Sequence, residues 1–91
     1  MLAKLAVLDL LDTYVTDDGL KHLTGLTNLS HLSLSGTPVT DDGLRHLTGL
    51  TSLRSLDVCD TQVTDEGVME LLEALPDCSI EWGARFDIQW D

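Results

Sequence analysis

The chain has few aromatic and few positively charged side chains. Phe, Trp and Tyr make up 4% of its 91 residues, so leucine has to supply most of the core. Lys and Arg together number 5 against 16 Asp and Glu, which gives a formal net charge of −11. Nucleic acids and anionic membranes require clustered Lys and Arg. The composition therefore disfavours both as partners and favours a partner with a basic surface.

Long apolar runs are also missing. No segment is long and apolar enough to span a bilayer. The first eight residues look briefly like a secretory leader, but Asp9 and Asp12 interrupt the apolar run, and Leu5 and Leu8 belong to the repeat described next. We therefore expect the protein not to be exported and to be cytoplasmic.

One stretch of the chain occurs twice almost letter for letter. Residues 15–27 read VTDDGLKHLTGLT, residues 39–51 read VTDDGLRHLTGLT, and a third, diverged copy begins at Val63. The copies are 24 residues apart, without an insertion in either interval. A fixed period of this length is typical of a solenoid of stacked repeats.

Each copy contains two apolar patterns. Leu8 and Leu10 belong to a period-2 segment, which predicts a short strand with one buried face. Leu20, Leu23 and Leu26 then follow a helical spacing. Stacked copies would form a parallel sheet on one side and helices on the other, with leucines between them. The predicted fold class is therefore α/β.

We predict one domain spanning residues 1–91, with repeats at about 5–28, 29–52 and 53–76 and a C-terminal cap at 77–91. Ile80 and Trp82 fall 24 residues after two repeat leucine or valine positions, so they would form a modified fourth strand whose larger side chains cover the end. Apolar residues alternate with polar ones further on and predict one more strand, at Ala84, Phe86, Ile88 and Trp90. Nothing comparable precedes the first repeat leucine, so we expect either that the chain is the C-terminal capping piece of a longer repeat array or that its exposed N-terminal end self-associates.

The turn that follows each strand carries a recurring polar motif. The threonine before each acidic pair is predicted to cap a helix N-terminus, at Thr16, Thr40 and Thr64. The acidic pairs would lie in the first helical turn, where the helix dipole favours negative charge. A glycine inside that turn predicts close backbone packing, at Gly19, Gly43 and Gly67. Gly25 and Gly49 are predicted to end the helices as C′ residues.

The motif Leu-x-x-Leu-x-Leu-x-x-Thr-x-Val-Thr-Asp-x-Gly-Leu resembles the leucine-rich repeat family, and the resemblance runs from about Leu5 to Leu75. It is nearest to short bacterial repeats and to the cysteine-containing repeats of F-box substrate adaptors. Those adaptor repeats carry Cys or Asn where this chain has Thr13, Thr37 and Thr61. A threonine hydroxyl can still bind the turn backbone. The resemblance implies a right-handed solenoid with a concave sheet, helices on the convex side, and a non-catalytic module for protein–protein interaction.

The same resemblance implies that partners contact the strand side chains that face away from the core. The residues predicted to bind a protein partner on this concave face are Val7, Asp9, His31, Ser33, Arg54, Ser55, Asp57 and Glu81. An adaptor role in ubiquitin transfer is a further possibility that only the resemblance implies, and the chain contains no F-box segment.

Catalysis and metal binding are weaker interpretations of the acidic residues. Asp57 and Glu81 would lie on adjacent strands, but an open sheet lacks the enclosure that acid–base chemistry needs. The acidic pairs at the helix starts could hold calcium, although helix capping already explains them. His22 and His46 would provide two metal ligands, which is too few for a structural zinc site. We therefore predict no enzymatic activity and no cofactor.

The two cysteines provide a test of the repeat register. Cys59 and Cys78 fall on neighbouring predicted strands, five positions apart in repeat coordinates. This offset corresponds to roughly 16 Å, at about 3.3 Å per strand residue. A disulfide cannot bridge that distance. The register therefore predicts two unlinked thiols, which suits a reducing compartment.

Overall fold

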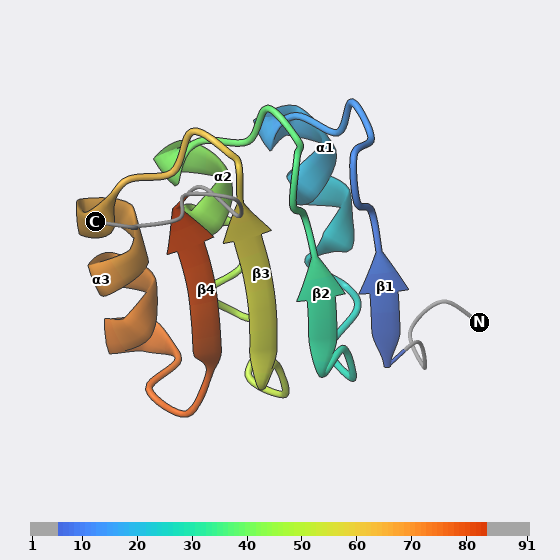
Figure 1. The fold of residues 1–91 in the computed structure, drawn as a ribbon. Helices are drawn as coiled ribbons and strands as arrows, with labels where there is room; N and C mark the ends of the chain where they lie inside the picture. The colour runs from blue at the N-terminus through green and yellow to red at the C-terminus, as the bar shows by residue number, and fades with distance from the viewer. Residues whose placement is uncertain (1–5, 84–91) are drawn as a thin grey trace.

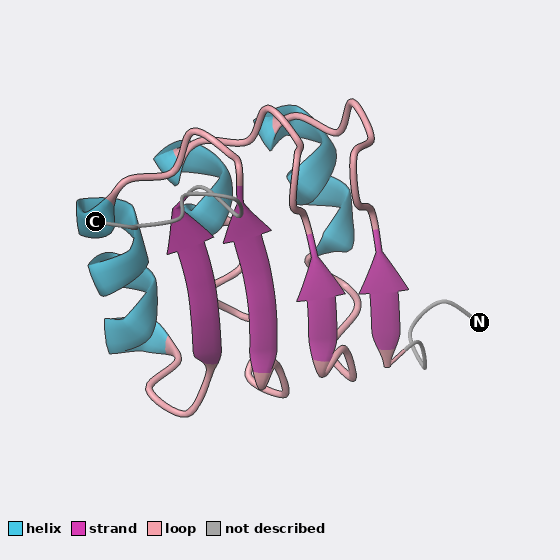
Figure 2. Cartoon of the chain, in the orientation of Figure 1, coloured by secondary structure: helices cyan, strands magenta, loops and turns pink. Residues whose placement is uncertain are grey.

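The computed structural model describes residues 6–83 as a four-stranded parallel sheet with helices against one face (Figures 1 and 2). The strand order follows the chain, β1-β2-β3-β4. The strands are β1 (Val7–Asp9), β2 (His31–Ser33), β3 (Ser55–Cys59) and β4 (Ser79–Gly83). The helical segments are α1 (Asp17–Leu20), the 3₁₀ turn η2 (Lys21–Leu23), α2 (Asp41–Arg45) and α3 (Asp65–Ala74). The predicted α/β solenoid is confirmed, and Figure 1 shows its right-handed course from β1 to β4.

The strand register follows the 24-residue period throughout. Val7 lies opposite His31, which lies opposite Ser55, which in turn lies opposite Ser79. Ile80 and Trp82 lie opposite Leu56 and Val58, as the repeat alignment predicts. Cys59 lies opposite Gly83, whereas Cys78 precedes the residue opposite Ser55. The two cysteines therefore lie near opposite ends of their strands, in agreement with the predicted offset.

Leucines from successive repeats fill the space between the sheet and the helices. The fully buried side chains include Leu32 and Leu34 from the second strand segment and Leu44 and Leu47 from the helical side. Three of their equivalents in the first repeat, Leu8, Leu10 and Leu23, are only partly buried, whereas Leu20 is fully buried. The layer at the N-terminal end of the described residues is thus the most exposed part of the core.

The threonine after each strand secures the turn in all three repeats. The hydroxyl groups of Thr13, Thr37 and Thr61 donate to the carbonyl groups of Leu10, Leu34 and Val58 at 2.8, 2.7 and 2.6 Å. These bonds match the role that we expect for threonine at this position.

The residue before that threonine adopts a left-handed backbone conformation in every repeat. The φ angles are 56° for Asp12, 78° for Gly36 and 57° for Asp60. Glycine adopts such angles without steric cost, and aspartate tolerates them better than most residues. A Cβ on Gly36 would lie 2.0 Å from Oδ1 of Asp12, so the glycine leaves room for the aspartate of the repeat before it.

The helical segments are shorter than the predicted helical spacing of Leu20, Leu23 and Leu26, because α1 ends at Leu20 and η2 at Leu23. α1 and α2 span 4 and 5 residues, whereas α3 spans 10. Gly25 follows Thr24, the C-cap of η2, and so takes the predicted C′ position, although its φ angle is not positive. The prediction is wrong for Gly49, which lies three residues beyond His46, the C-cap of α2. Turns that follow Leu23 and Leu47 complete the convex side of the first two repeats. Gly25 and Gly49 lie in these turns and do not adopt a left-handed conformation.

The Thr-Asp motif joins neighbouring repeats and does more than cap helices. Asp17 accepts two hydrogen bonds from Thr40, from the amide at 2.8 Å and from the hydroxyl at 2.6 Å. Asp41 binds Thr64 of the next repeat in the same way, at 2.7 and 2.6 Å. Thr40 and Thr64 also cap their own helices, but Thr16 makes no side-chain cap bond, so that part of the prediction is wrong.

The aspartates of this motif explain two of the glycines that recur every 24 residues. A Cβ on Gly43 would lie 2.4 Å from Oδ1 of Asp17, and one on Gly67 would lie 2.1 Å from Oδ1 of Asp41. The predicted close packing is therefore present at these two positions. At Gly19 the nearest side-chain atom, on Val15, would be 3.3 Å away, so the packing there is looser.

Within residues 6–83, no helix has the length and apolar character needed to cross a membrane. The predicted strand at Ala84, Phe86, Ile88 and Trp90 lies outside the described residues.

Candidate protein-binding face

The open face of the sheet carries ordered columns of side chains because each strand repeats its register against the next. One column contains Val7, His31, Ser55 and Ser79, and the next contains Asp9, Ser33, Asp57 and Glu81. The helical segments lie against the opposite face of the sheet (Figure 2). The structure thus brings seven of the eight predicted binding residues together in two adjacent columns.

Two connected hollows lie on this open face. The larger, of about 430 Å³, is lined by Asp9, Leu11, Asp12, Ser33, Ser35, Asp57 and Asp60. The smaller, of about 170 Å³, is lined by Val7, Leu8, Asp9, His31, Leu32, Ser33, Ser55 and Asp57. Asp9, Ser33 and Asp57 line both, so the two hollows are continuous along β2.

The larger hollow exists because the middle repeat has small side chains. Ser33, Ser35 and Gly36 of the second repeat are flanked by Asp9, Leu11 and Asp12 of the first. On the other side they are flanked by Asp57, Cys59 and Asp60 of the third. The first and third strands are two strand spacings apart, roughly 9.5 Å. We call this hollow the acidic trough, with a floor formed by Ser33 and Ser35 and a wall of aspartate on each side.

Backbone amides orient the two aspartates within the strands. Oδ1 of Asp9 accepts a hydrogen bond of 3.0 Å from the amide of Leu11, and Oδ1 of Asp57 accepts one of 3.0 Å from the amide of Cys59. Ser33 occupies the equivalent position of the middle repeat. These bonds fix two carboxylates at the same height on opposite walls of the acidic trough.

Arg54 lies apart from the other predicted binding residues. It precedes β3, and its Nη1 donates to the carbonyl groups of Thr51 and Leu53 at 3.0 and 3.3 Å. It lines a separate hollow together with Pro76 and Asp77, at the edge where the strands begin. His31 is on the open face, and its Nδ1 lies 2.8 Å from Oγ of Ser30. The positive charge of Arg54 thus lies before the amino end of β3, apart from the aspartates of the acidic trough.

Comparisons with known proteins agree with this geometry. A family model described as a leucine-rich repeat matches residues 25–47 and 49–72, slightly more than half of the chain. The chain belongs to the leucine-rich repeat family. An internalin structure from Listeria monocytogenes matches with a TM-score of 0.54 and 18% sequence identity over 91% of this chain. The chain spans 29% of the length of that internalin, and the likeness shows the fold alone. No curated protein matches the chain in sequence.

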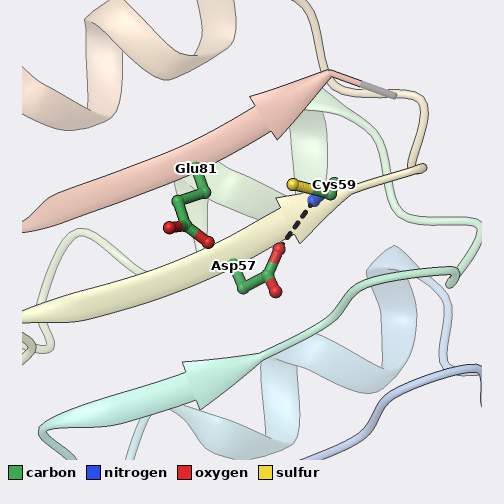
Figure 3. A group of neighbouring side chains, drawn as sticks. All are labelled: Asp57, Cys59 and Glu81. Carbon is green, nitrogen blue, oxygen red and sulfur yellow. Dashed lines mark hydrogen bonds between the residues drawn. The ribbon is translucent and has the colours of Figure 1, made fainter. Parts of the chain in front are cut away.

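Three side chains of β3 and β4 form a cluster on this leucine-rich repeat sheet (Figure 3). Asp57, Cys59 and Glu81 each provide one ligand atom, and these atoms lie within 4.8 Å of one another. Asp57 and Glu81 are the pair that adjacent predicted strands bring together, and in the structure Cys59 joins them. These three groups are fewer than the four ligands of a structural zinc site, and Glu81 is exposed. Figure 3 shows the three side chains on neighbouring strands, and Asp57 also lines the acidic trough.

The second cysteine belongs to the core. Cys78 is 5% exposed, and its burial raises the pKa of the thiol, while the nearby charge of Arg54 lowers it to a smaller extent. A raised pKa leaves less thiolate at neutral pH, so this cysteine is a poor nucleophile or metal ligand.

Sequence reasoning missed Asp12 and Asp60 as lining residues of this leucine-rich repeat face. Both lie just after the strands, beyond the columns that the strand pattern identifies, whereas Ser35 belongs to an outward-facing column of that pattern. The period did contain a sign of them, because Asp12, Gly36 and Asp60 are 24 residues apart and glycine alternates with aspartate. A position shared by these two residue types is typical of a left-handed conformation.

Proposed function

We propose that this leucine-rich repeat chain is a non-catalytic protein-interaction module that binds its partner through the open, concave face of the sheet. The observation that carries the proposal is the uncovered pair of side-chain columns, since ordered side chains on a parallel sheet remain exposed on the face opposite the helices. A sheet holds these groups in fixed positions before binding. Binding therefore costs little side-chain and backbone entropy.

Exposed apolar side chains on the same face support a protein partner. Val7 is 59% exposed and Leu11 is 47% exposed, and they line the smaller and larger hollows respectively. A partner that covered them would remove apolar surface from water. The arrangement offers no enclosed cleft for catalysis, which favours binding over enzymatic activity.

Site-specific photo-crosslinking tests the proposal. A photoreactive residue replaces Ser55 on the open face or Glu73 on the exposed side of α3, and each variant is incubated with an extract of the source cells. We expect crosslinked protein from the Ser55 variant and none from the Glu73 variant. Crosslinks from Glu73 alone would move the interface to the convex side. The identity of the captured protein also tests an adaptor role, because an adaptor for ubiquitin transfer would capture its substrate through this face.

A second candidate function is self-assembly through the N-terminal end. It is favoured by the partly buried Leu8, Leu10 and Leu23 and by Thr16. Within residues 6–83 no aspartate binds Thr16 in the way that Asp17 binds Thr40. Light scattering at two protein concentrations distinguishes the two functions. A monomer at both concentrations favours the open face, and a species that grows with concentration favours assembly.

A further inference from the structure

We propose that the acidic trough binds an arginine side chain of the partner, presented by a short extended segment that also places an apolar residue over Val7. This inference rests on the proposed function, since it names the chemistry of the partner at the same face. Its three grounds are the charge of the trough, its width, and the apolar side chains that adjoin it.

The charge of the acidic trough is entirely negative. Asp9, Asp12, Asp57 and Asp60 line it, and none of the described residues that line it carries a positive charge. Like charges brought together on one surface repel each other, and a cationic partner group relieves that repulsion. The whole chain has a net charge of −11, which also speeds the approach of a cationic partner.

The width of the trough favours a guanidinium group over a bare metal ion. Its two aspartate walls stand on strands two spacings apart, roughly 9.5 Å. Calcium binds oxygen ligands at about 2.3–2.6 Å, so carboxylates on opposite walls would have to converge on one point to share it. A guanidinium group carries five N–H donors in a planar fork and can bind carboxylates on both sides. The serine floor of the middle repeat leaves space for it between the walls.

The position of Asp12 brings a carboxylate towards the trough. Its side chain lies where a Cβ of residue 36 would stand, so Gly36 lets the first repeat reach over the second. The two carboxylates oriented by backbone amides, Asp9 and Asp57, lie at the same height on either side. The acceptors are thus positioned from both walls before a ligand arrives.

The smaller hollow extends the trough towards Val7 and His31 and sets the length of the segment. From His31 to Ser35 the middle repeat spans about 13 Å at roughly 3.3 Å per residue. An extended segment of about five residues covers this distance, with arginine at one end and an apolar side chain near Val7 at the other. Val7 is 59% exposed, so an apolar contact there removes it from water.

Binding of short blocked peptides to the intact chain tests the inference. The probe is the pentapeptide leucine-serine-glycine-serine-arginine, acetylated and amidated, together with its reversed order. The matched control peptides replace arginine by citrulline, which keeps the shape but removes the charge, or by lysine. Backbone amide shifts in nitrogen-15 NMR spectra report both the affinity and the location. We expect the arginine peptide to shift the amides of Ser33, Ser35 and Asp57, and to bind at least about tenfold more tightly than the citrulline peptide.

Two double variants separate the trough from general charge. In Asp9→Asn with Asp57→Asn, the amide oxygens still accept the bonds from Leu11 and Cys59. The fold is therefore kept while two charges are lost. The control, Glu73→Gln with Asp77→Asn, removes the same charge from exposed positions off the open face. We expect the first variant to lose at least about tenfold in affinity, equivalent to about 1.4 kcal/mol, and the control to bind as the parent does. Thermal unfolding checks that both variants are folded.

Several results would overturn the inference. Equal affinity for the arginine and citrulline peptides would show that the positive charge does not contribute to binding. Equal affinity for the arginine and lysine peptides would show that a guanidinium group is not required. Shifts at the trough from calcium chloride that exceed those from the arginine peptide would make it a metal site. Absence of binding by every peptide would also overturn it, yet would leave the photo-crosslinking result at Ser55 standing. Crosslinks from Glu73 alone would overturn the proposed function itself.

Discussion

At the scale of single residues, the first aspartate of each Thr-Asp-acidic motif and the acidic residue after it have different roles. Asp17 is half-buried and binds the amide and hydroxyl of Thr40, whereas Asp18 is exposed and pairs with Lys21 at 3.4 Å. Both lie in the first turn of α1 and interact equally with the helix dipole. A comparison of the two therefore isolates the link between repeats.

We expect Asp17→Ala to lower the free energy of unfolding by about 1.5–3 kcal/mol, because it leaves the amide and hydroxyl of Thr40 without their charged acceptor. The matched variant Asp18→Ala should change it by less than about 0.5 kcal/mol, since an exposed ion pair contributes little. Urea unfolding followed by circular dichroism measures both. Equal losses in the two variants would show that the helix dipole, and not the link between repeats, explains the motif.

Gly67 and Gly49 provide a second residue-scale comparison. A Cβ on Gly67 would lie 2.1 and 2.3 Å from Oδ1 and Cγ of Asp41, whereas one on Gly49 would meet no atom within 4 Å. Gly67→Ala should therefore destabilise the protein by about 1–3 kcal/mol, as overpacking does. Gly49→Ala should be neutral or stabilising by up to about 1 kcal/mol, since it restricts the unfolded chain. Melting temperatures that fall in both variants would contradict this account.

At the scale of elements, the series of hydrogen bonds from each repeat to the aspartate of the repeat before it ends at β4, where the donor is no longer a threonine. Asp17 and Asp41 bind a threonine of the next repeat, but Asp65 accepts a hydrogen bond of 2.7 Å from Nε1 of Trp82. The third aspartate is thus paired within the described residues by an indole on the neighbouring strand. This bond connects α3 to β4 across the end of the sheet.

A double-mutant cycle measures that connection. Trp82→Phe keeps an aromatic ring but removes the indole donor, and Asp65→Ala removes the acceptor. We expect a coupling energy of about 0.5–1.5 kcal/mol between the two positions, because the bond is charge-assisted but exposed. The control cycle combines Trp82→Phe with Glu66→Ala, the next acidic residue of α3, and should give a coupling near zero. A coupling in the control cycle as large as in the first would assign the effect to general charge.

At the scale of the whole molecule, the 24-residue period determines most of what could be predicted. The parallel strand order, the register and the two open-face columns all follow from translating one repeat, and the structure places Val7, His31 and Ser55 side by side as expected. The contacts between repeats could not be predicted in this way. Asp17 has a sufficient local explanation at a helix start, and nothing local shows that it reaches Thr40, 23 residues further along the chain.

The acidic trough could be predicted only in part, for a related reason. Asp9 and Asp57 belong to the strand pattern, but the trough also depends on Ser33 and Ser35 being smaller than their equivalents in the flanking repeats. A consensus of the repeats averages out this difference. The departures from the consensus at residues 33 and 35 therefore shape the proposed binding site, while the consensus determines the fold.

The stability of the molecule should rise from the first repeat to the third. β1 and β2 have 3 residues each and β3 and β4 have 5, and α3 is the longest helix of the described residues. Each repeat of a solenoid is stabilised mainly by its neighbours, so an end layer with partly buried leucines opens most readily. Opening of the first repeat should leave the others folded.

Amide hydrogen exchange tests this gradient at equivalent positions. The amide of Leu10 donates to Ser33 at 2.9 Å and that of Leu34 donates to Asp57 at 2.7 Å, in the same register of adjacent repeats. We expect Leu10 to be less protected than Leu34 by at least about tenfold, or about 1.4 kcal/mol of opening free energy. Leu8→Ala should speed exchange at Leu10 alone, whereas Leu32→Ala, in the fully packed middle layer, should speed it at both. Equal protection at the two amides, with both variants acting on both, would mean that the three repeats open as one unit, because the links through Asp17 and Asp41 would then couple them more strongly than their separate cores do.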